Sequence, residues 1–124
     1  MEKLLTQTRR HDISFDRNGL IRLSAHVVRT LDINQGDSIN IELSNGEYLL
    51  CVIRHDQTVG RYQACCHSTK KKSNNMYASS VRLCRALLDR LSISESRASF
   101  AVGLPLITAE GVKLPIITRQ PITN

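Results

Sequence analysis

The sequence predicts a mainly β protein with two short helices, and three observations support that prediction. The chain has 124 residues, which suits one compact domain over 1–124 or two small halves that share a core. Aromatic residues make up only 4% and Trp is absent, so Val, Ile and Leu must fill the interior, which favours β-rich packing. Short apolar segments with a period of two recur along the chain, separated by polar turn sequences.

The first half reads as two hairpins that flank a short helix. Its predicted strands cover 12–16, 20–24, 38–43 and 48–53, with Asn-Gly turn signals at 16–19 and 44–47. The segment between the hairpins favours a helix, because Ser24 suits an N-cap and Val27, Val28 and Leu31 cover one face.

The third strand alternates strictly, which places Ile39, Ile41 and Leu43 on one face. The fourth strand, "YLLCVI", is apolar throughout, as expected of a strand that is covered on both faces.

The second half repeats this order with weaker turn signals. We expect strands at 61–67, 76–83, 98–102 and 112–118, and a helix over 84–93. The basic segment 68–75 reads as an exposed loop, and 119–124 reads as a tail. Pro115 indicates that the last strand lies at an edge, because proline cannot donate a hydrogen bond to the ladder.

The two halves share one pattern of strand, short helix, L-x-I, turn and strand. A gap-free alignment pairs Ile21 with Val81, Arg22 with Arg82, Leu23 with Leu83, Leu31 with Leu91 and Ile33 with Ile93. A unit of about 45 residues buries too little apolar surface to be stable alone. We therefore expect two units, about 12–53 and 61–118, to close one shared, pseudo-dimeric core. A chance likeness between β-rich segments is the competing interpretation.

One set of residues in the first unit matches a known pattern. Its members are a leading glycine, Gly19, then Arg29, Leu31 and Ile33 in "R-x-L-x-I", and Gly36, Asp37, Ile39 and Ile41 in "G-D-x-ϕ-x-ϕ". In these residues 12–53 resembles the swapped-hairpin module of the AbrB/SpoVT family, and the internal repeat extends the resemblance over 76–118. The sequence departs from the family at Leu20, often basic, and at Ser24, often proline. In the second copy, Ser79 and Ser96 stand where the first has Gly19 and Gly36.

The resemblance implies a fold and a function. The fold would be a pseudo-dimeric swapped-hairpin β-barrel built from two ββαββ repeats. The function would be that of a non-enzymatic, DNA-binding transcriptional regulator, with double-stranded DNA as the partner. The alternative is a protein-interaction module, antitoxin-like or an assembly component, that has lost DNA binding.

The charge distribution also favours an anionic partner. Net charge is +6, but residues 1–60 hold seven Lys/Arg against eight Asp/Glu, whereas 61–124 hold ten against three. The competing interpretation is a basic surface that only keeps the protein from associating.

The candidate DNA contacts are the basic side chains of both units. They are Arg10, Arg17, Arg22, Arg29, Lys70, Lys71, Lys72, Arg82 and Arg85. The alignment places Arg22 and Arg82 on equivalent strands, where paired cations could neutralise phosphates of one duplex. Alternatively, Arg22 is simply the solvent face of a strand. Lys70–Lys72 would act as a flexible arm or keep a loop solvated.

Other classes of site find little support in the sequence. Cys51 and Cys84 lie in apolar patterns and read as buried thiols. Cys65 and Cys66 are adjacent, so their side chains would point to opposite faces of a strand, which argues against a metal site. No nucleophile, phosphate-loop or cofactor motif is visible. We expect a cytoplasmic protein without a membrane span, either a monomer with a pseudo-dimeric core or a homodimer.

Overall fold

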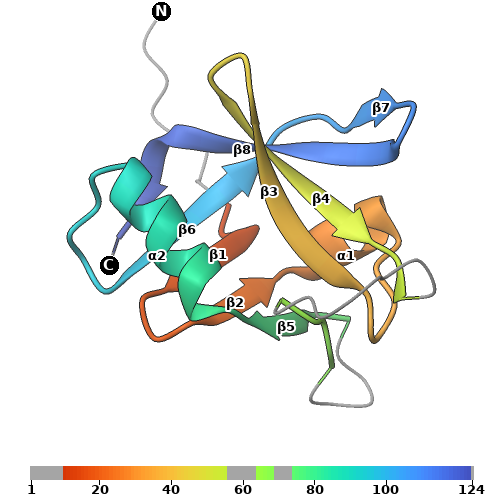
Figure 1. The fold of residues 1–124 in the computed structure, drawn as a ribbon, viewed down its shortest axis with the longest axis horizontal. Helices are drawn as coiled ribbons and strands as arrows, with labels where there is room; N and C mark the ends of the chain where they lie inside the picture. Colours follow the sequence, from red (N-terminus) through yellow and green to blue (C-terminus); the bar gives the residue numbers. More distant parts are fainter. Residues whose placement is uncertain (1–9, 56–63, 69–73, 124) are drawn as a thin grey trace, which may run out of the picture.

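The chain forms one strongly curled antiparallel sheet with two short helices, as Figure 1 shows. The computed structural model describes residues 10–55, 64–68 and 74–123. The strands are β1 (Ile13–Asp16), β2 (Leu20–Leu23), β3 (Ser38–Ser44), β4 (Glu47–Ile53), β5 (Met76–Ser79), β6 (Arg97–Val102), β7 (Leu106–Thr108) and β8 (Gly111–Ile122). The helices are α1 (Ala25–Leu31) and α2 (Val81–Arg90). The prediction of a mainly β fold with two short helices is confirmed.

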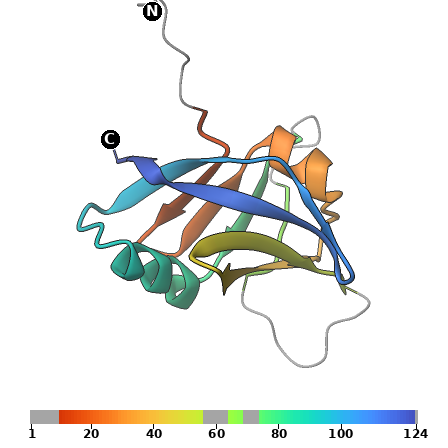
Figure 2. The same cartoon turned by 90° about the horizontal axis from the view of Figure 1, so that it is seen from above.

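The sheet curls into a half-barrel around the core. Its strand order is β3-β4-β8-β6-β1-β2-β5, and β7 lies off this path beside β8. Figure 2 shows the curl from a second direction. Residues 64–68 lie between the two outermost strands, because Cys65 bridges to Ser38 of β3 and His67 bridges to Tyr77 of β5.

The core is built from both halves of the chain. The rings of Phe15 and Phe100, on paired strands, lie 6.0 Å apart between centroids. Around them pack fully buried aliphatic side chains, including Ile21, Leu50, Leu88 and Leu114. This interior of Val, Ile and Leu around two Phe rings fits the composition, which left few aromatic residues to fill it.

The helix cap and the second hairpin turn predicted in the first half are confirmed. The Ser24 hydroxyl accepts a hydrogen bond from the Val27 amide at 3.4 Å and caps α1, as predicted. Asn45 and Gly46 both have positive φ, 51° and 78°, as a two-residue hairpin turn requires. On β3 the expected apolar face is correct only in part, because Ile39 is buried while Leu43 extends beyond the core and is 53% exposed.

The predicted boundary between strand and helix in the second half is wrong. β5 ends at Ser79, and the Ser80 hydroxyl accepts a hydrogen bond from the Leu83 amide at 3.1 Å, so α2 begins about one turn earlier than expected. Arg82 therefore lies on a helix, whereas Arg22 lies on a strand. The pairing of 21–23 with 81–83, and the idea of two arginines on equivalent strands, are both corrected.

The ends of the two helices do match in the predicted register. The Ile33 amide donates to the Val28 carbonyl at 3.0 Å, and the Ile93 amide donates to the Leu88 carbonyl at 2.9 Å. The predicted pair Ile33 and Ile93 thus occupies the same place after each helix, and both side chains are buried. Hence α2 is the longer helix, and its extra length lies at its N-terminal end.

The prediction of an edge strand at Pro115 is wrong, because β8 pairs with β4 on one side and with β6 on the other. The Gly103 amide donates to the Pro115 carbonyl at 2.8 Å, just beyond the end of β6. The N and C=O of one strand residue point to the same side, so the missing N–H also faces this side and removes no hydrogen bond to β4. The predicted tail is likewise part of β8, where Ile122 pairs with Ser99.

Candidate nucleic-acid interface

A row of polar side chains crosses the outer face of four neighbouring strands. Tyr77 on β5 lies opposite Arg22 on β2, Arg22 lies opposite Ser14 on β1, and Ser14 lies opposite Ser99 on β6. The residues on either side of each belong to the core or pack against it, so alternation turns this row away from the interior. Side chains opposite one another in such pairs lie about 5 Å apart at Cβ, close enough to contact one ligand together.

The row forms the floor of a hollow of about 410 Å³. Its lining residues are His11, Ser14, Arg22, Leu23, Ser24, Asn75, Met76, Tyr77, Arg97 and Ser99. The charged residues in this lining, Arg22 and Arg97, are both cationic, and hydroxyl and amide groups surround them. We call this surface the arginine hollow. It offers an anion two guanidinium groups, neutral donors and one aromatic ring.

Two carboxylates near the arginine hollow are engaged in the fold. Asp12 is buried, accepts a hydrogen bond from the Val102 amide at 3.0 Å and lies 3.4 Å from Arg10 Nε. Asp16 lies opposite Arg97 and accepts a hydrogen bond from the Asn18 amide at 3.2 Å. Both acids therefore have partners within the chain.

Three predicted contact residues make structural contacts of their own, and one of them is Arg85, whose Nε donates to the Arg17 carbonyl at 3.5 Å. Arg10 reaches Asp12 and, at 3.4 Å, the Val102 carbonyl. Arg17 donates to the carbonyls of Ile93 and Glu95 and to the Asp89 carboxylate, and so holds the segment that follows α2. The sequence could not show this use of Arg17, because its partners come from the other half of the chain.

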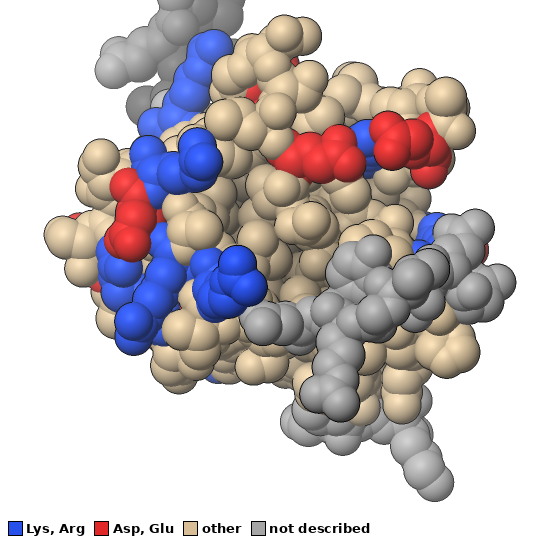
Figure 3. Space-filling model, viewed as in Figure 1, with Lys and Arg blue, Asp and Glu red and all other residues tan. Residues whose placement is uncertain are grey.

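Three predicted arginines are divided between the helices. Arg82 and Arg85 lie exposed on α2, where Figure 3 shows basic side chains gathered, and Arg29 lies exposed on α1. The antiparallel β2 and β5 lead into α1 and α2 respectively, so the two helices begin at opposite ends of this strand pair. The structure thus brings Arg22 together with Arg97, which the sequence reasoning did not select. Lys70, Lys71 and Lys72 lie outside the described residues.

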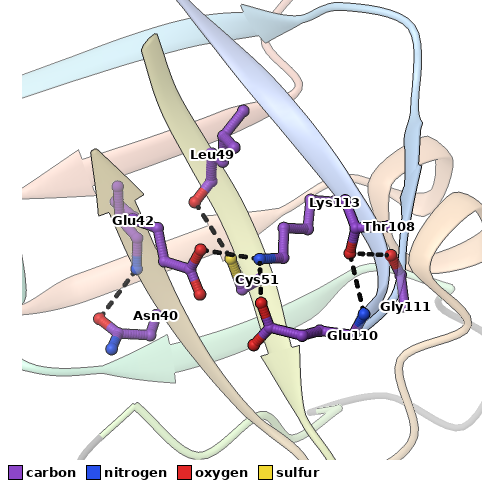
Figure 4. Close-up of polar contacts among 9 residues, drawn as sticks. Asn40, Glu42, Leu49, Cys51, Thr108, Glu110, Gly111 and Lys113 are labelled. Carbon is purple, nitrogen blue, oxygen red and sulfur yellow. Dashed lines mark hydrogen bonds and ion pairs between the residues drawn. The ribbon is translucent and has the colours of Figure 1, made fainter. Parts of the chain in front are cut away.

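A second polar cluster joins β8 to β3, as Figure 4 shows. Lys113 is 8% exposed, and its Nζ lies 2.8 Å from Glu42 Oε2 and 3.3 Å from Glu110 Oε1. The hydrogen bond between them lowers the pKa of Glu42 and raises the pKa of Lys113. Burial, with the nearby Glu42 charge, raises the pKa of Cys51 to about 11, so this thiol stays neutral at ordinary pH.

The other cysteines follow the predicted placement. Cys84 is buried as expected, and Cys65 is exposed while its neighbour Cys66 is buried. Burial raises the pKa of Cys66 to about 12 and that of Cys84 to about 11, so neither resembles an activated nucleophile. Within 10–55, 64–68 and 74–123, no three His, Cys, Asp or Glu side chains are grouped so that they could hold a metal ion.

Comparison of the chain with protein-family models, curated proteins and solved structures found no match. Across the described part of the chain, neither helix is long and apolar enough to cross a membrane.

Proposed function

We propose that this protein is a non-enzymatic, DNA-binding transcriptional regulator of the AbrB-like type, and that the arginine hollow meets the phosphate backbone of double-stranded DNA. One observation carries this proposal: Arg22 and Arg97 share one hollow whose lining contains no carboxylate. Guanidinium groups suit phosphate oxygens because they donate two parallel hydrogen bonds. Arg29, Arg82 and Arg85, exposed on the two helices, would add phosphate contacts at the flanks.

The strand pairings support the idea that two swapped-hairpin units make up the chain. β1 of the first half pairs with β6 of the second, and 64–68 of the second half bridges to β3 of the first. Among the named strands, the remaining pairings between halves join β2 to β5 and β4 to β8. Two interlocked ββαββ units related by an approximate dyad would produce this exchange, and Arg22 and Tyr77 would then lie beside the dyad.

Fluorescence anisotropy with a labelled duplex tests the proposal. Affinity should fall as salt rises, and the slope of log affinity against log salt should become shallower by about 0.9 for each phosphate contact that is removed. Arg22→Gln and Arg97→Gln should each show that change. Arg90→Gln removes the same charge from a groove on another surface, so it should leave the slope unchanged.

Two results would reject this assignment. One is the absence of binding by the wild-type protein at low salt. The other is an equal loss for all three variants, which would mean that the arginine hollow has no special part. Thermal unfolding of each variant checks that its fold is intact.

The second candidate, a protein-interaction module without DNA binding, is favoured by a different observation. The β7–β8 hairpin and the segment that leads into it expose large apolar side chains, with Leu104 85% and Ile107 89% accessible. Monomeric proteins rarely expose clusters of this kind without an interaction partner. A pull-down that yields a stoichiometric protein partner, together with no duplex binding at low salt, would favour this candidate over the first.

A further inference from the structure

The β7–β8 hairpin presents an apolar surface at one end of the molecule, at the upper right of Figure 1. Ile107 of β7 lies opposite Val112 of β8, and both side chains are exposed. In β8, Val112 continues the inward-facing series of Leu114 and Ile116, but it lies beyond the core that buries those two residues. This pair, with Leu104 exposed in the segment just before β7, makes the end of the molecule suited to enter an apolar groove.

The hairpin is fixed to the body of the protein, and its base is acidic. Lys113 of β8 binds Glu42 of β3, so the hairpin cannot swing freely (Figure 4). The same ammonium pairs with Glu110 in the hairpin turn, whose side chain is 77% exposed. Two carboxylates therefore surround one buried ammonium group, and the charge facing solvent here is negative. A rigid projecting element loses little entropy on docking.

An apolar groove lies between α2 and the β3–β4 hairpin. Its lining residues are Ile41, Leu43, Tyr48, Leu83, Ala86, Leu87 and Arg90, and its volume is about 260 Å³. Small-molecule sites usually measure roughly 300–1,000 Å³, so this groove better suits one or two inserted aliphatic side chains. We call it the α2 groove.

The rim of the α2 groove carries the charge opposite to that of the hairpin. Arg90 lines it, and Arg82 and Arg85 lie exposed on the same helix. The nearby acid Asp89 is already bound by Arg17 at 2.9 Å. In Figure 3, basic side chains lie over α2 at the left of the view and acidic side chains lie at the upper right. Largely uncharged surface separates the two groups.

We propose that the β7–β8 hairpin of one copy of this chain docks in the α2 groove of a second copy. Leu104 and Ile107 enter the groove, and Glu110 pairs with Arg90 across the contact. Apolar burial supplies the affinity, while the opposite charges select the orientation. This contact uses neither Arg22 nor Arg97, so it leaves the arginine hollow uncovered. It does share the α2 surface that carries Arg82 and Arg85, the proposed flanking phosphate contacts.

Analytical ultracentrifugation of the intact protein, without DNA, tests the contact. The wild-type chain should associate as its concentration rises. Ile107→Lys, which damages the hairpin, and Ala86→Arg, which fills the exposed side of the groove, should each weaken association by about tenfold or more. Ile117→Lys makes the same kind of change at an exposed position outside both surfaces, so it should associate like the wild type.

A mixing experiment separates this contact from any other mode of self-association. Ile107→Lys retains an intact groove and Ala86→Arg retains an intact hairpin, so their equimolar mixture should form a 1:1 heterodimer at concentrations where each alone is monomeric. A contact between two hairpins could not be restored in this way. The proposal is overturned if the wild type stays monomeric at the highest concentration reached, or if the mixture shows no heterodimer while both variants remain folded by thermal unfolding.

Discussion

At the residue scale, Asp37 shows how one buried side chain can join distant segments. Its carboxylate accepts hydrogen bonds from the amides of Asn34 and His55, both at 2.9 Å, and from Arg54 at 3.0 Å. Arg54 in turn donates to the Leu31 carbonyl at the end of α1. Burial alone would raise the pKa of Asp37, but these hydrogen bonds and the Arg54 charge hold the pKa below its ordinary value.

Replacing this carboxylate should make the stability loss depend on pH. Asp37→Asn should lower the free energy of unfolding by about 2–3 kcal/mol at pH 7, because charged hydrogen bonds are lost at a buried site. A lowered folded-state pKa stabilises the protein above the ordinary pKa of about 3.9, and that contribution disappears as pH falls through the folded-state value. The difference between variant and wild type should therefore shrink below about pH 4.

Urea unfolding of both proteins at pH 7, 5 and 3 measures this difference. If the difference in unfolding free energy is the same at all three pH values, the ionised form of Asp37 does not stabilise the fold. If the difference grows toward low pH, the pKa of Asp37 is raised on folding and not lowered.

Residue identity predicted part of the candidate site. Arg22 could be selected from the sequence because it is the charged residue between two apolar residues of a predicted strand. Tyr77 and Ser99, which belong to the same row, could not be selected, since only the register of β5, β1 and β6 aligns them with Arg22. Arg17 looked equally available, yet its guanidinium binds carbonyl groups after α2. The identity of a residue gives its charge. Whether that charge is available to a ligand depends on partners that are distant in the sequence.

At the element scale, local turn and cap chemistry was predictable, whereas the start of α2 was not. In "SVRLC", Val81 and Leu83 fit an alternating strand as well as the first turn of a helix. The N-cap bond of Ser80 and the packing of Cys84 and Leu87 into the core decide for the helix. The edge-strand prediction at Pro115 was wrong for a related reason. Whether a proline costs a ladder hydrogen bond depends on which neighbouring strand its nitrogen faces.

The turn between β1 and β2 offers a test of element packing. Gly19 has φ +104°, and a Cβ there would lie 2.9 Å from Val81 Cγ2 and 3.0 Å from Val81 N. Gly46 also has positive φ, +78°, but a Cβ there would have no neighbour within 4 Å. Gly46→Ala therefore reports backbone strain alone, whereas Gly19→Ala reports strain together with a clash at the start of α2.

We expect Gly46→Ala to cost about 1 kcal/mol and Gly19→Ala about 2–3 kcal/mol or more. Chemical denaturation of the two variants alongside the wild type measures the difference. Equal losses would show that α2 is free to move away from the β1–β2 turn.

At the scale of the whole molecule, the two halves of the chain are interleaved. The pairs β1–β6, β2–β5 and β4–β8 each join a strand of the first half to one of the second. The sheet and the core each contain strands or side chains from both halves. A shared core was expected from the small size of each half, but the strand order depends on long-range pairing that composition and periodicity do not specify.

Cutting the chain between its halves should therefore abolish independent folding. Separate fragments 1–60 and 61–124 should each lack cooperative thermal unfolding by circular dichroism, because each leaves its apolar face uncovered. Mixed together, they should regain the spectrum and a cooperative transition. A cooperative transition in either fragment alone would show that a half is a domain in its own right.

The segment 64–68 also has a consequence for motion. It connects the outermost strands by a few hydrogen bonds, among them Cys66 N to the Asp37 carbonyl at 2.7 Å and the reciprocal pair between His67 and Tyr77 at 2.8 and 2.9 Å. The β3–β4 pair, in contrast, is joined along seven matched positions. We expect these few hydrogen bonds to open locally without global unfolding. The amide protons of 64–68 should therefore exchange with deuterium earlier than those of β4. Water would then reach the core first between β3 and β5, where the curled sheet is held by the fewest hydrogen bonds.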